Sequence, residues 1–285
     1  MLELSKFRSE TDAAIERTKT LMAVPHEKGK EFDLRGELYD LAMCMCPYAR
    51  AGDLEAMYEW IAPQKGETCI DIAAGTGFLT KAVAAWTGAR VYAVDYSRVQ
   101  LEAIASARPY QIVPIINSLA QESGRPDRVG ILDQITEQVD ILTSFGGLHH
   151  VYYQKRMMEH AARLMKPGGR FVAADVGGDT PLAWHFDDVV ARKCLTGHTA
   201  RWLTESRLQQ LVAPLDLELT RCEMRDLTWI FTSREQMALF FKGLHAYDSS
   251  DEEIINDLYD ALGFEEVHGQ VHLNWPMLFF DIRKV

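Results

Sequence analysis

Short apolar runs alternate with amphipathic segments through the middle of the chain, from about residue 61 to 177. The runs have the length and β-branched content of buried strands. They are Thr68–Ile72, Arg90–Val94, Ile112–Ile116, Val139–Thr143 and Arg170–Asp175. Strands that alternate with helices form a parallel sheet covered on both faces, so this region predicts an α/β fold. A turn at Lys166–Gly169 and a short helix at Val129–Thr136 complete it.

The segments on either side have mainly helical patterns. Residues 1–60 predict a helical N-terminal cap that Pro25 and Pro47 interrupt. Later helices are predicted at 183–196, 204–212, 233–246 and 251–262, with strands at Leu217–Met224 and His272–Ile282. The chain is therefore divided into a cap (1–60), an α/β core (61–177) and a third part (178–285) of further cap helices and final sheet strands.

A glycine turn follows the first apolar run directly. The run contains Asp71, and Gly75-Thr76-Gly77 leads into a helix over Leu79–Trp86. Glycines let backbone approach a ligand closely, and a helix N-terminus offers unpaired N–H groups and a positive dipole end. Asp95 ends the second run about 20 residues later, where nucleotide-binding folds place a carboxylate on the ribose hydroxyls. These features predict a cofactor that contains adenosine.

Details of the loop narrow the choice of cofactor. A phosphate-binding P-loop needs Gly-Lys-Ser/Thr, and Thr80-Lys81-Ala82 stands there instead. A dinucleotide loop needs a third Gly or Ala, and that position is Thr80. Asp71 would repel a pyrophosphate but suits a cation, such as the amino group of a methionine moiety. A nicotinamide dehydrogenase is therefore the weaker alternative.

Four stretches, in order, resemble the class I S-adenosylmethionine-dependent methyltransferases. They are Asp71–Gly77 (first motif), Val94–Ser97 (second acidic motif), Val139–His150 (fourth strand and its loop) and Leu164–Val172 (turn into the fifth strand). The resemblance covers about residues 60 to 177. It implies a Rossmann-like, seven-stranded, mostly parallel sheet with helices on both faces, completed by a C-terminal hairpin. The N-terminal cap and the helical insertions in the C-terminal part would then cover the cofactor cleft.

The resemblance also implies the site residues. The residues expected to bind S-adenosylmethionine, or its product S-adenosylhomocysteine, are Tyr39, Asp71, Ala73, Gly75, Gly77, Asp95, Tyr96, Ser118, Leu119, Ser144 and Phe145. Asn117-Ser118 stands where the family often has an acid. His149 and His150 are the candidate general bases, because an imidazole titrates near neutral pH. The alternative is that one histidine satisfies a backbone carbonyl and the other packs against the next helix.

Composition and charge limit the classes of partner and the cellular location that we expect for this protein. The 285 residues carry a formal net charge of −11, which disfavours nucleic acid and anionic membranes. No apolar stretch reaches the ~20 residues that span a bilayer, and the N-terminus shows no signal-peptide core. Five cysteines without a framework pattern indicate a cytoplasmic protein with free thiols. Cys44-Met45-Cys46 lacks a second pair, so no metal site is expected.

The sequence therefore predicts a cytoplasmic enzyme that methylates a small organic metabolite by in-line displacement, with a homodimer as one option for its assembly. Carbon, oxygen and nitrogen acceptors remain open. Candidate acceptor-binding residues are the aromatic set Trp184, Trp202, Trp229, Trp275 and Phe240-Phe241, with Arg192, Arg201 and Arg225 for a carboxylate. The alternatives are an enzyme that uses the same cofactor for other chemistry and a catalytically silent cofactor-binding scaffold.

Overall fold

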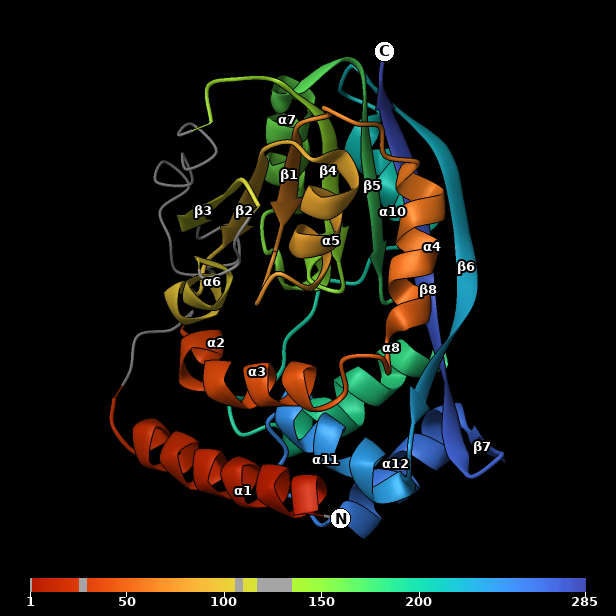
Figure 1. Cartoon of the computed structure of the whole chain (residues 1–285). Helices are drawn as coiled ribbons and strands as arrows, with labels where there is room; N and C mark the ends of the chain where they lie inside the picture. The colour runs from red at the N-terminus through yellow and green to blue at the C-terminus, as the bar shows by residue number, and fades with distance from the viewer. Residues whose placement is uncertain (1, 26–29, 106–109, 117–134) are drawn as a thin grey trace. The chain divides into compact units, whose positions relative to one another are not determined.

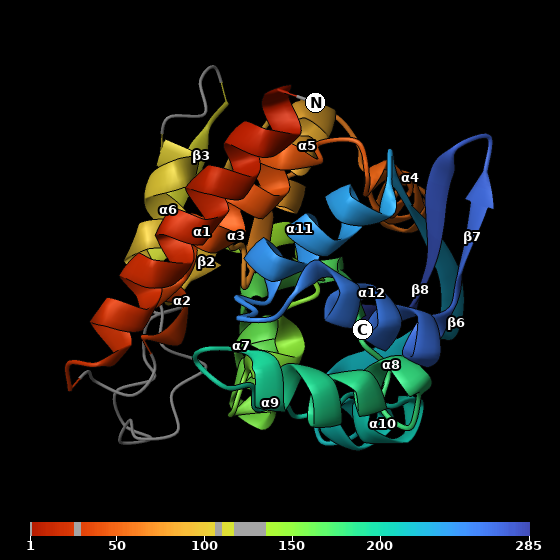
Figure 2. The ribbon, with the colours of Figure 1, turned by 90° about the horizontal axis from the view of Figure 1, so that it is seen from below.

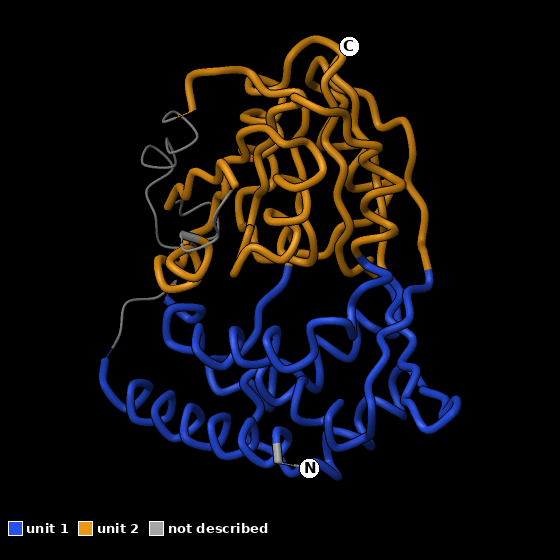
Figure 3. Tube along the Cα trace, viewed as in Figure 1, with its two compact units in different colours: residues 1–53, 179–200, 226–276 blue, residues 54–178, 201–225, 277–285 orange. Residues whose placement is uncertain are grey.

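The computed structural model describes residues 2–25, 30–105, 110–116 and 135–285 (Figure 1). By their internal contacts these residues form two compact units, each assembled from separate segments (Figure 3). Unit 1 comprises residues 1–53, 179–200 and 226–276, and unit 2 comprises residues 54–178, 201–225 and 277–285. The predicted division into three consecutive parts followed motifs rather than contacts, and it stays a prediction.

The sheet confirms the predicted fold class. Its order is β3-β2-β1-β4-β5-β8-β6, and β7 pairs with β8 beside this path, which gives eight strands rather than seven. The pairs among β1 to β5 are parallel, and β8 runs antiparallel to β5. The strands are β1 (Cys69–Ile72), β2 (Val91–Asp95), β3 (Ile112–Ile116), β4 (Val139–Phe145), β5 (Met165–Asp175), β6 (Leu217–Phe231), β7 (Phe264–Val267) and β8 (Gln270–Lys284).

Helices lie on both faces of the sheet in unit 2. Figures 1 and 2 show α4 and α5 on one face, with α7 and α10 on the other. The core beneath α7 and α10 is apolar and includes Leu142, Met157, Leu208 and Phe280. The helices of this unit are α4 (Ala51–Ile61, whose first turn belongs to unit 1), α5 (Phe78–Thr87), α6 (Arg98–Ala105), η3 (Leu148–His150), α7 (Gln154–Leu164) and α10 (Glu205–Val212). The predicted helix at Val129–Thr136 lies largely outside the described residues.

The predicted turn at Lys166–Gly169 is wrong. Strand β5 already begins at Met165, and its pairing with β4 jumps from Val139↔Met165 to Ile141↔Arg170. The extra residues form an irregularity inside the strand, where Gly168 adopts a φ of 74°. Glycine adopts this left-handed conformation without a Cβ penalty, so the turn-like sequence bends the strand instead of preceding it.

Unit 1 is mostly helical. Helix α11 packs against α1, α3 and α12. A Cβ at Gly243 of α11 would lie 2.8 Å from the Leu38 carbonyl oxygen, so glycine permits the close approach to α3. Ser250 and Glu253 form a capping box that starts α12. The helices are α1 (Leu2–Met22), α2 (Glu31–Leu34), α3 (Gly36–Met45), α8 (Pro181–His185), the π-helix η4 (Phe186–Val190), α9 (Ala191–Lys193), α11 (Arg234–Leu244) and α12 (Asp251–Leu262).

Two features of unit 1 differ from the sequence prediction. The helix expected over 183–196 ends at Lys193 and contains a π-helical turn at its centre. Strand β7 was not predicted, because Phe264-Glu265-Glu266-Val267 has only two apolar residues. None of the helices in the described ranges combines the length and the apolar character that crossing a membrane requires.

Candidate active site

The carboxyl ends of β1 and β2 are joined through Asp95. Its Oδ2 accepts the backbone N–H of Gly75 at 2.9 Å, and its Oδ1 accepts the N–H of Ser97 at 2.9 Å. Gly75 and Gly77 have φ values of 56° and 85°, which favour glycine. A Cβ at Gly77 would also lie 2.8 Å from the Ile104 side chain. The glycine turn and the acid predicted to act together therefore lie in direct contact.

The loops after β1 and β4 also touch. A Cβ at Gly147 would lie only 2.5 Å from the Cβ of Ala73. Ala73 itself has a φ of 56°, which a residue with a side chain rarely adopts. This contact brings the first motif beside the segment that contains Ser144, Phe145, His149 and His150.

Asp71 is buried, with 1% of its surface exposed. The Thr80 hydroxyl donates to its Oδ2 at 2.5 Å, and the Thr143 hydroxyl donates to its Oδ1 at 2.9 Å. Burial, with a smaller contribution from the charge of Asp95, raises the pKa of Asp71 to about 7. Asp71 therefore links α5 and β4 to β1, a structural role beside the cofactor contact that the sequence predicts.

The segment after β4 contains a buried hydroxyl group. Ser144 is fully buried, and its Oγ has no hydrogen-bond partner among the residues that the structure describes. Phe145 is half-buried, with its ring centroid 6.1 Å from that of Phe78 on α5. An unpaired buried hydroxyl is costly, so a ligand atom that pairs with Ser144 would be favoured.

His149 lies in η3 and is held by Asp175, the last residue of β5. Nδ1 of His149 lies 2.6 Å from Asp175 Oδ1, and the His149 backbone N–H donates to Oδ2 at 3.0 Å. Val176 N–H adds a third hydrogen bond to Oδ1 at 2.7 Å. Because a carboxylate only accepts, Nδ1 of His149 carries a proton in this pair. The pair is almost fully buried, at 4% and 1% exposure.

Two further rings lie against His149 within unit 2. The His150 ring centroid is 4.0 Å away, and that of Trp202 is 5.2 Å away. The His149 carbonyl accepts the backbone N–H of Arg201 at 2.8 Å. The sequence analysis missed Asp175. A usable signal existed, because Asp175 ends the fifth strand as Asp95 ends the second.

The remaining predicted residues are less informative. Tyr96 is half-buried beside Asp95. Tyr39 is half-buried on α3 of unit 1, and its N–H bonds the Arg35 carbonyl at 3.0 Å. Ser118 and Leu119 lie outside the described residues. Direct contact of these four residues with a cofactor remains a prediction.

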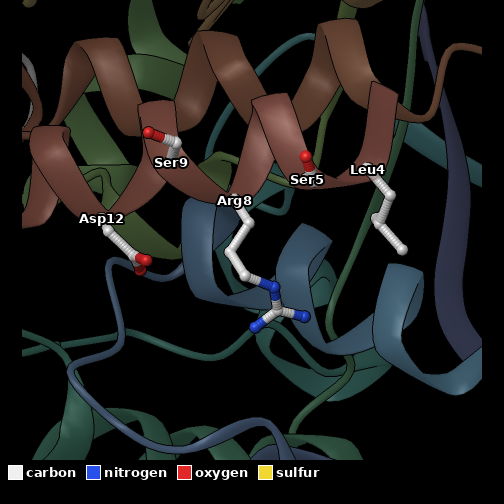
Figure 4. A pocket seen from close by; sticks show the side chains of 5 residues that line it. All are labelled: Leu4, Ser5, Arg8, Ser9 and Asp12. Carbon is white, nitrogen blue, oxygen red and sulfur yellow. The ribbon is translucent and has the colours of Figure 1, made fainter. Parts of the chain in front are cut away.

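A surface pocket of about 550 Å³ lies elsewhere, along α1 in unit 1 (Figure 4). Its lining residues are Leu4, Ser5, Arg8, Ser9 and Asp12. Arg8 is directed toward α12 and donates to Asp251 at 2.6 Å. Its cation is therefore already paired, and no histidine lines the pocket, so it is a weaker candidate for catalysis.

Comparison with known proteins identifies the domain. Residues 70–173 match the family model described as "Methyltransferase domain". They contain the glycine turn, Asp71 and Asp95. This region is a class I methyltransferase domain. The chain is 28% identical to a demethylmenaquinone methyltransferase from Clavibacter sepedonicus over 175 residues, which cover 61% of this chain and 58% of that protein. It is 33% identical to a ubiquinone biosynthesis O-methyltransferase from Coxiella burnetii over 106 residues, or 37% and 42% of the two chains.

The fold of the chain is also similar to that of solved structures. A mycolic acid cyclopropane synthase complexed with S-adenosylhomocysteine superposes with a TM-score of 0.58 at 13% identity, covering 91% of this chain and 99% of that chain. At this identity the likeness concerns the fold. The chain spans about half the length of the curated relatives it matches.

The cofactor of this family is S-adenosylmethionine, and the methyltransferase domain of this chain fits it. Asp95 lies against the glycine turn, and the Ser144 hydroxyl is buried with no hydrogen-bond partner among the described residues. Thr80 occupies the position of the third glycine, and its hydroxyl donates a hydrogen bond to Asp71. A dinucleotide-binding loop does not require such a hydrogen bond. The dehydrogenase alternative is therefore not supported.

Proposed function

We propose that this chain transfers the methyl group of S-adenosylmethionine to a small organic molecule by in-line displacement and releases S-adenosylhomocysteine. The contact between Asp95 and Gly75 supports this proposal most strongly, because it assembles a ribose-binding carboxylate and a glycine turn in one place. Two of the curated relatives are named demethylmenaquinone methyltransferase and ubiquinone biosynthesis O-methyltransferase, which supports a small acceptor. Which atom of the acceptor is methylated remains open.

The residues of unit 2 have separate tasks in this proposal. Asp95 receives the ribose hydroxyls, and the glycine turn and Ser144 position the remainder of the cofactor. The cofactor supplies a methyl group already activated by a sulfonium. The chain contributes orientation and exclusion of water, which by themselves lower a barrier by several kcal/mol.

His149 is the proposed general base. Asp175 holds the proton on Nδ1, so Nε2 is the nitrogen that takes a proton from the acceptor. The carboxylate then stabilises the imidazolium that forms, as in other histidine–aspartate pairs. A general base contributes about 10²–10⁴-fold when the acceptor must lose a proton. His150, whose ring lies against that of His149, shapes the site in this proposal.

Two alternatives remain beside methyl transfer. The solved cyclopropane synthase has the same fold, so the fold alone leaves the final product open. A silent cofactor-binding scaffold would bind the cofactor without turnover. We place the reaction in the cytoplasm, because none of the five cysteines forms a disulfide with another in the described residues. We expect a metabolite rather than nucleic acid or membrane as the partner, because the net charge is −11. A homodimer is part of this proposal and is tested by light scattering.

Mass spectrometry of the product tests the proposal. The protein is incubated with S-adenosylmethionine that carries a deuterated methyl group and with a panel of phenols, amines and enolic metabolites. Methyl transfer predicts an acceptor that gains the labelled methyl in place of hydrogen, together with one S-adenosylhomocysteine per event. Consumption of the cofactor with a different mass change would establish the other chemistry. Cofactor binding without consumption across the panel would favour the scaffold.

A further inference from the structure

Arg35 of unit 1 is a buried cation without an acidic partner. It lies between α2 and α3 and is 4% exposed. Nη1 donates to Cys194 Sγ at 3.0 Å and to the His245 carbonyl at 3.5 Å, and the guanidinium carbon lies 4.1 Å from the centroid of the Phe32 ring. Within the described ranges, Nε has no hydrogen-bond partner and no carboxylate pairs with this side chain.

Arg50, another buried arginine of unit 1, has the acidic partner that is expected of an arginine with a structural role. Arg50 is similarly buried, and its Nε lies 2.7 Å from Asp53 Oδ2. Removing a charged group from water is costly unless an opposite charge compensates it. Arg35 has only a thiol, a carbonyl and a ring face as partners, and all three are neutral. An incoming anion would supply the missing charge.

The partners of Arg35 connect it to an aromatic cluster. The Phe186 ring centroid lies 5.1 Å from that of His245 and 6.1 Å from that of Trp275. Trp275 in turn stacks on Trp229 at 4.2 Å. His185, next to Phe186, is buried, and both of its ring nitrogens lack a hydrogen-bond partner among the described residues. Arg35 thus lies against the Phe32 ring and against the backbone of His245, whose own ring belongs to the cluster.

The arginines that the sequence analysis suggested for this task are already engaged. Arg192 pairs with Asp188 at 3.0 Å, and Arg225 pairs with Glu59 at 2.9 Å. Arg201 stacks over the Tyr152 ring at 3.8 Å. Arg35 is the better candidate, because among the described residues its Nε has no hydrogen-bond partner and its charge has no opposite charge beside it.

We propose that Arg35 binds the carboxylate of an aromatic acid, whose ring packs beside Phe32, His245 and Phe186. The planar guanidinium matches a planar carboxylate through two parallel hydrogen bonds. This binding does not rest on the proposed methyltransferase function, so the two claims can fail separately.

Calorimetric titration of the full chain with benzoate and with benzamide is the first test. Both probes have the same ring, but only benzoate carries a charge. The proposal expects benzoate to bind and benzamide to bind at least about tenfold more weakly, as for a lost charge-assisted pair. Equal affinities, or no detectable benzoate binding, would overturn it. Titration of the same sample with S-adenosylhomocysteine separates the claims, because its failure would count against the proposed function instead.

Variants of Arg35 provide the second test. Arg35→Met is expected to lose the preference for benzoate, and Arg35→Lys to keep the charge but bind roughly tenfold more weakly without the two-pronged geometry. Arg192→Met is the matched control on the surface and should bind benzoate like the parent protein. Benzoate affinity unchanged in Arg35→Met would contradict the proposal. If Arg35→Met does not fold, an unchanged affinity of Arg35→Lys for benzoate would contradict the proposal.

Thermal unfolding distinguishes a binding role from a structural one. Replacing an uncompensated buried charge by an apolar side chain of similar length is often neutral or stabilising. Arg35→Met is therefore expected to unfold at the same temperature as the parent protein or at a higher one. Benzoate should raise the unfolding temperature of the parent protein but not that of Arg35→Met. An equal rise in both proteins would overturn the proposal.

Discussion

Asp175 holds His149 by its ring and by its backbone, because its two carboxylate oxygens lie 2.6 Å from Nδ1 and 3.0 Å from the main-chain nitrogen. The end of β5 thereby fixes both the tautomer and the direction of an imidazole that follows β4. A histidine that only packed against a helix would not need both contacts. This relationship is the strongest structural argument for a general base in this chain.

Replacing Asp175 by Asn tests this role. We expect kcat to fall at least about tenfold, because the variant no longer stabilises the imidazolium, while the Kd for S-adenosylhomocysteine stays unchanged. His149→Gln should lower kcat by about 10²-fold or more. Asp216→Asn, an exposed acid of unit 2, is the control. The kcat values are measured with the acceptor that the label-transfer experiment identifies. Equal values in the parent, Asp175→Asn and His149→Gln would show that His149 and Asp175 take no part in catalysis.

The Asp95 carboxylate should determine cofactor affinity. Asp95→Asn keeps the shape of the side chain but weakens the hydrogen bonds to the ribose and to Gly75 N–H. We expect calorimetric affinity for S-adenosylhomocysteine to drop by about 1–3 kcal/mol. Asp260→Asn, on the exposed face of α12, should leave affinity unchanged. If both variants bind equally well, Asp95 does not hold the ribose.

The contact between Gly147 and Ala73 predicts a coupled pair of substitutions. Gly147→Ala should cost about 1–3 kcal/mol of folding free energy, because its new Cβ would meet the Ala73 Cβ at 2.5 Å. Ala73→Gly removes that atom and relieves a φ of 56°. The double variant is therefore expected to recover part of the loss in chemical denaturation. Strictly additive effects would show that the two loops do not touch as described.

The buried Asp71 should make stability depend on pH. Its folded-state pKa of about 7 lies above that of the unfolded chain, near 4. Between these values the folded state holds a proton that the unfolded state has released, so this group lowers stability as pH rises from about 4 to 7. Asp71→Asn lacks this titration. The stability of the parent relative to Asp71→Asn should decline across that window and level off above it, and a constant difference would contradict the assignment.

The sequence predicted the parts of the fold that depend on local pattern. The runs at Ile112–Ile116 and 251–262 appear with the predicted bounds, and the other strands of the core differ mainly at their ends. Local pattern failed at Lys166–Gly169, because a Pro-Gly-Gly sequence suits a turn and an irregular strand equally well. It also failed at the π-helical turn of Phe186–Val190, which has no simple signature.

Contacts between residues that lie far apart along the chain could not be predicted from the sequence. Asp175 is 26 positions from His149, and Arg35 is 159 and 210 positions from the two groups that it contacts. A lone acid at a strand end or an arginine beside a glycine carries no information about such partners. The same holds for Asp71, whose two threonine partners decide that it is buried and hydrogen-bonded rather than freely presented to a ligand.

The central claim is that the glycine turn and Asp95 bind a sulfonium cofactor. Calorimetric titration of the purified chain with S-adenosylmethionine, S-adenosylhomocysteine and NAD, in parallel, tests it most directly. The account predicts micromolar binding of both sulfur ligands and no heat from NAD. Binding of NAD without either sulfur ligand would contradict it.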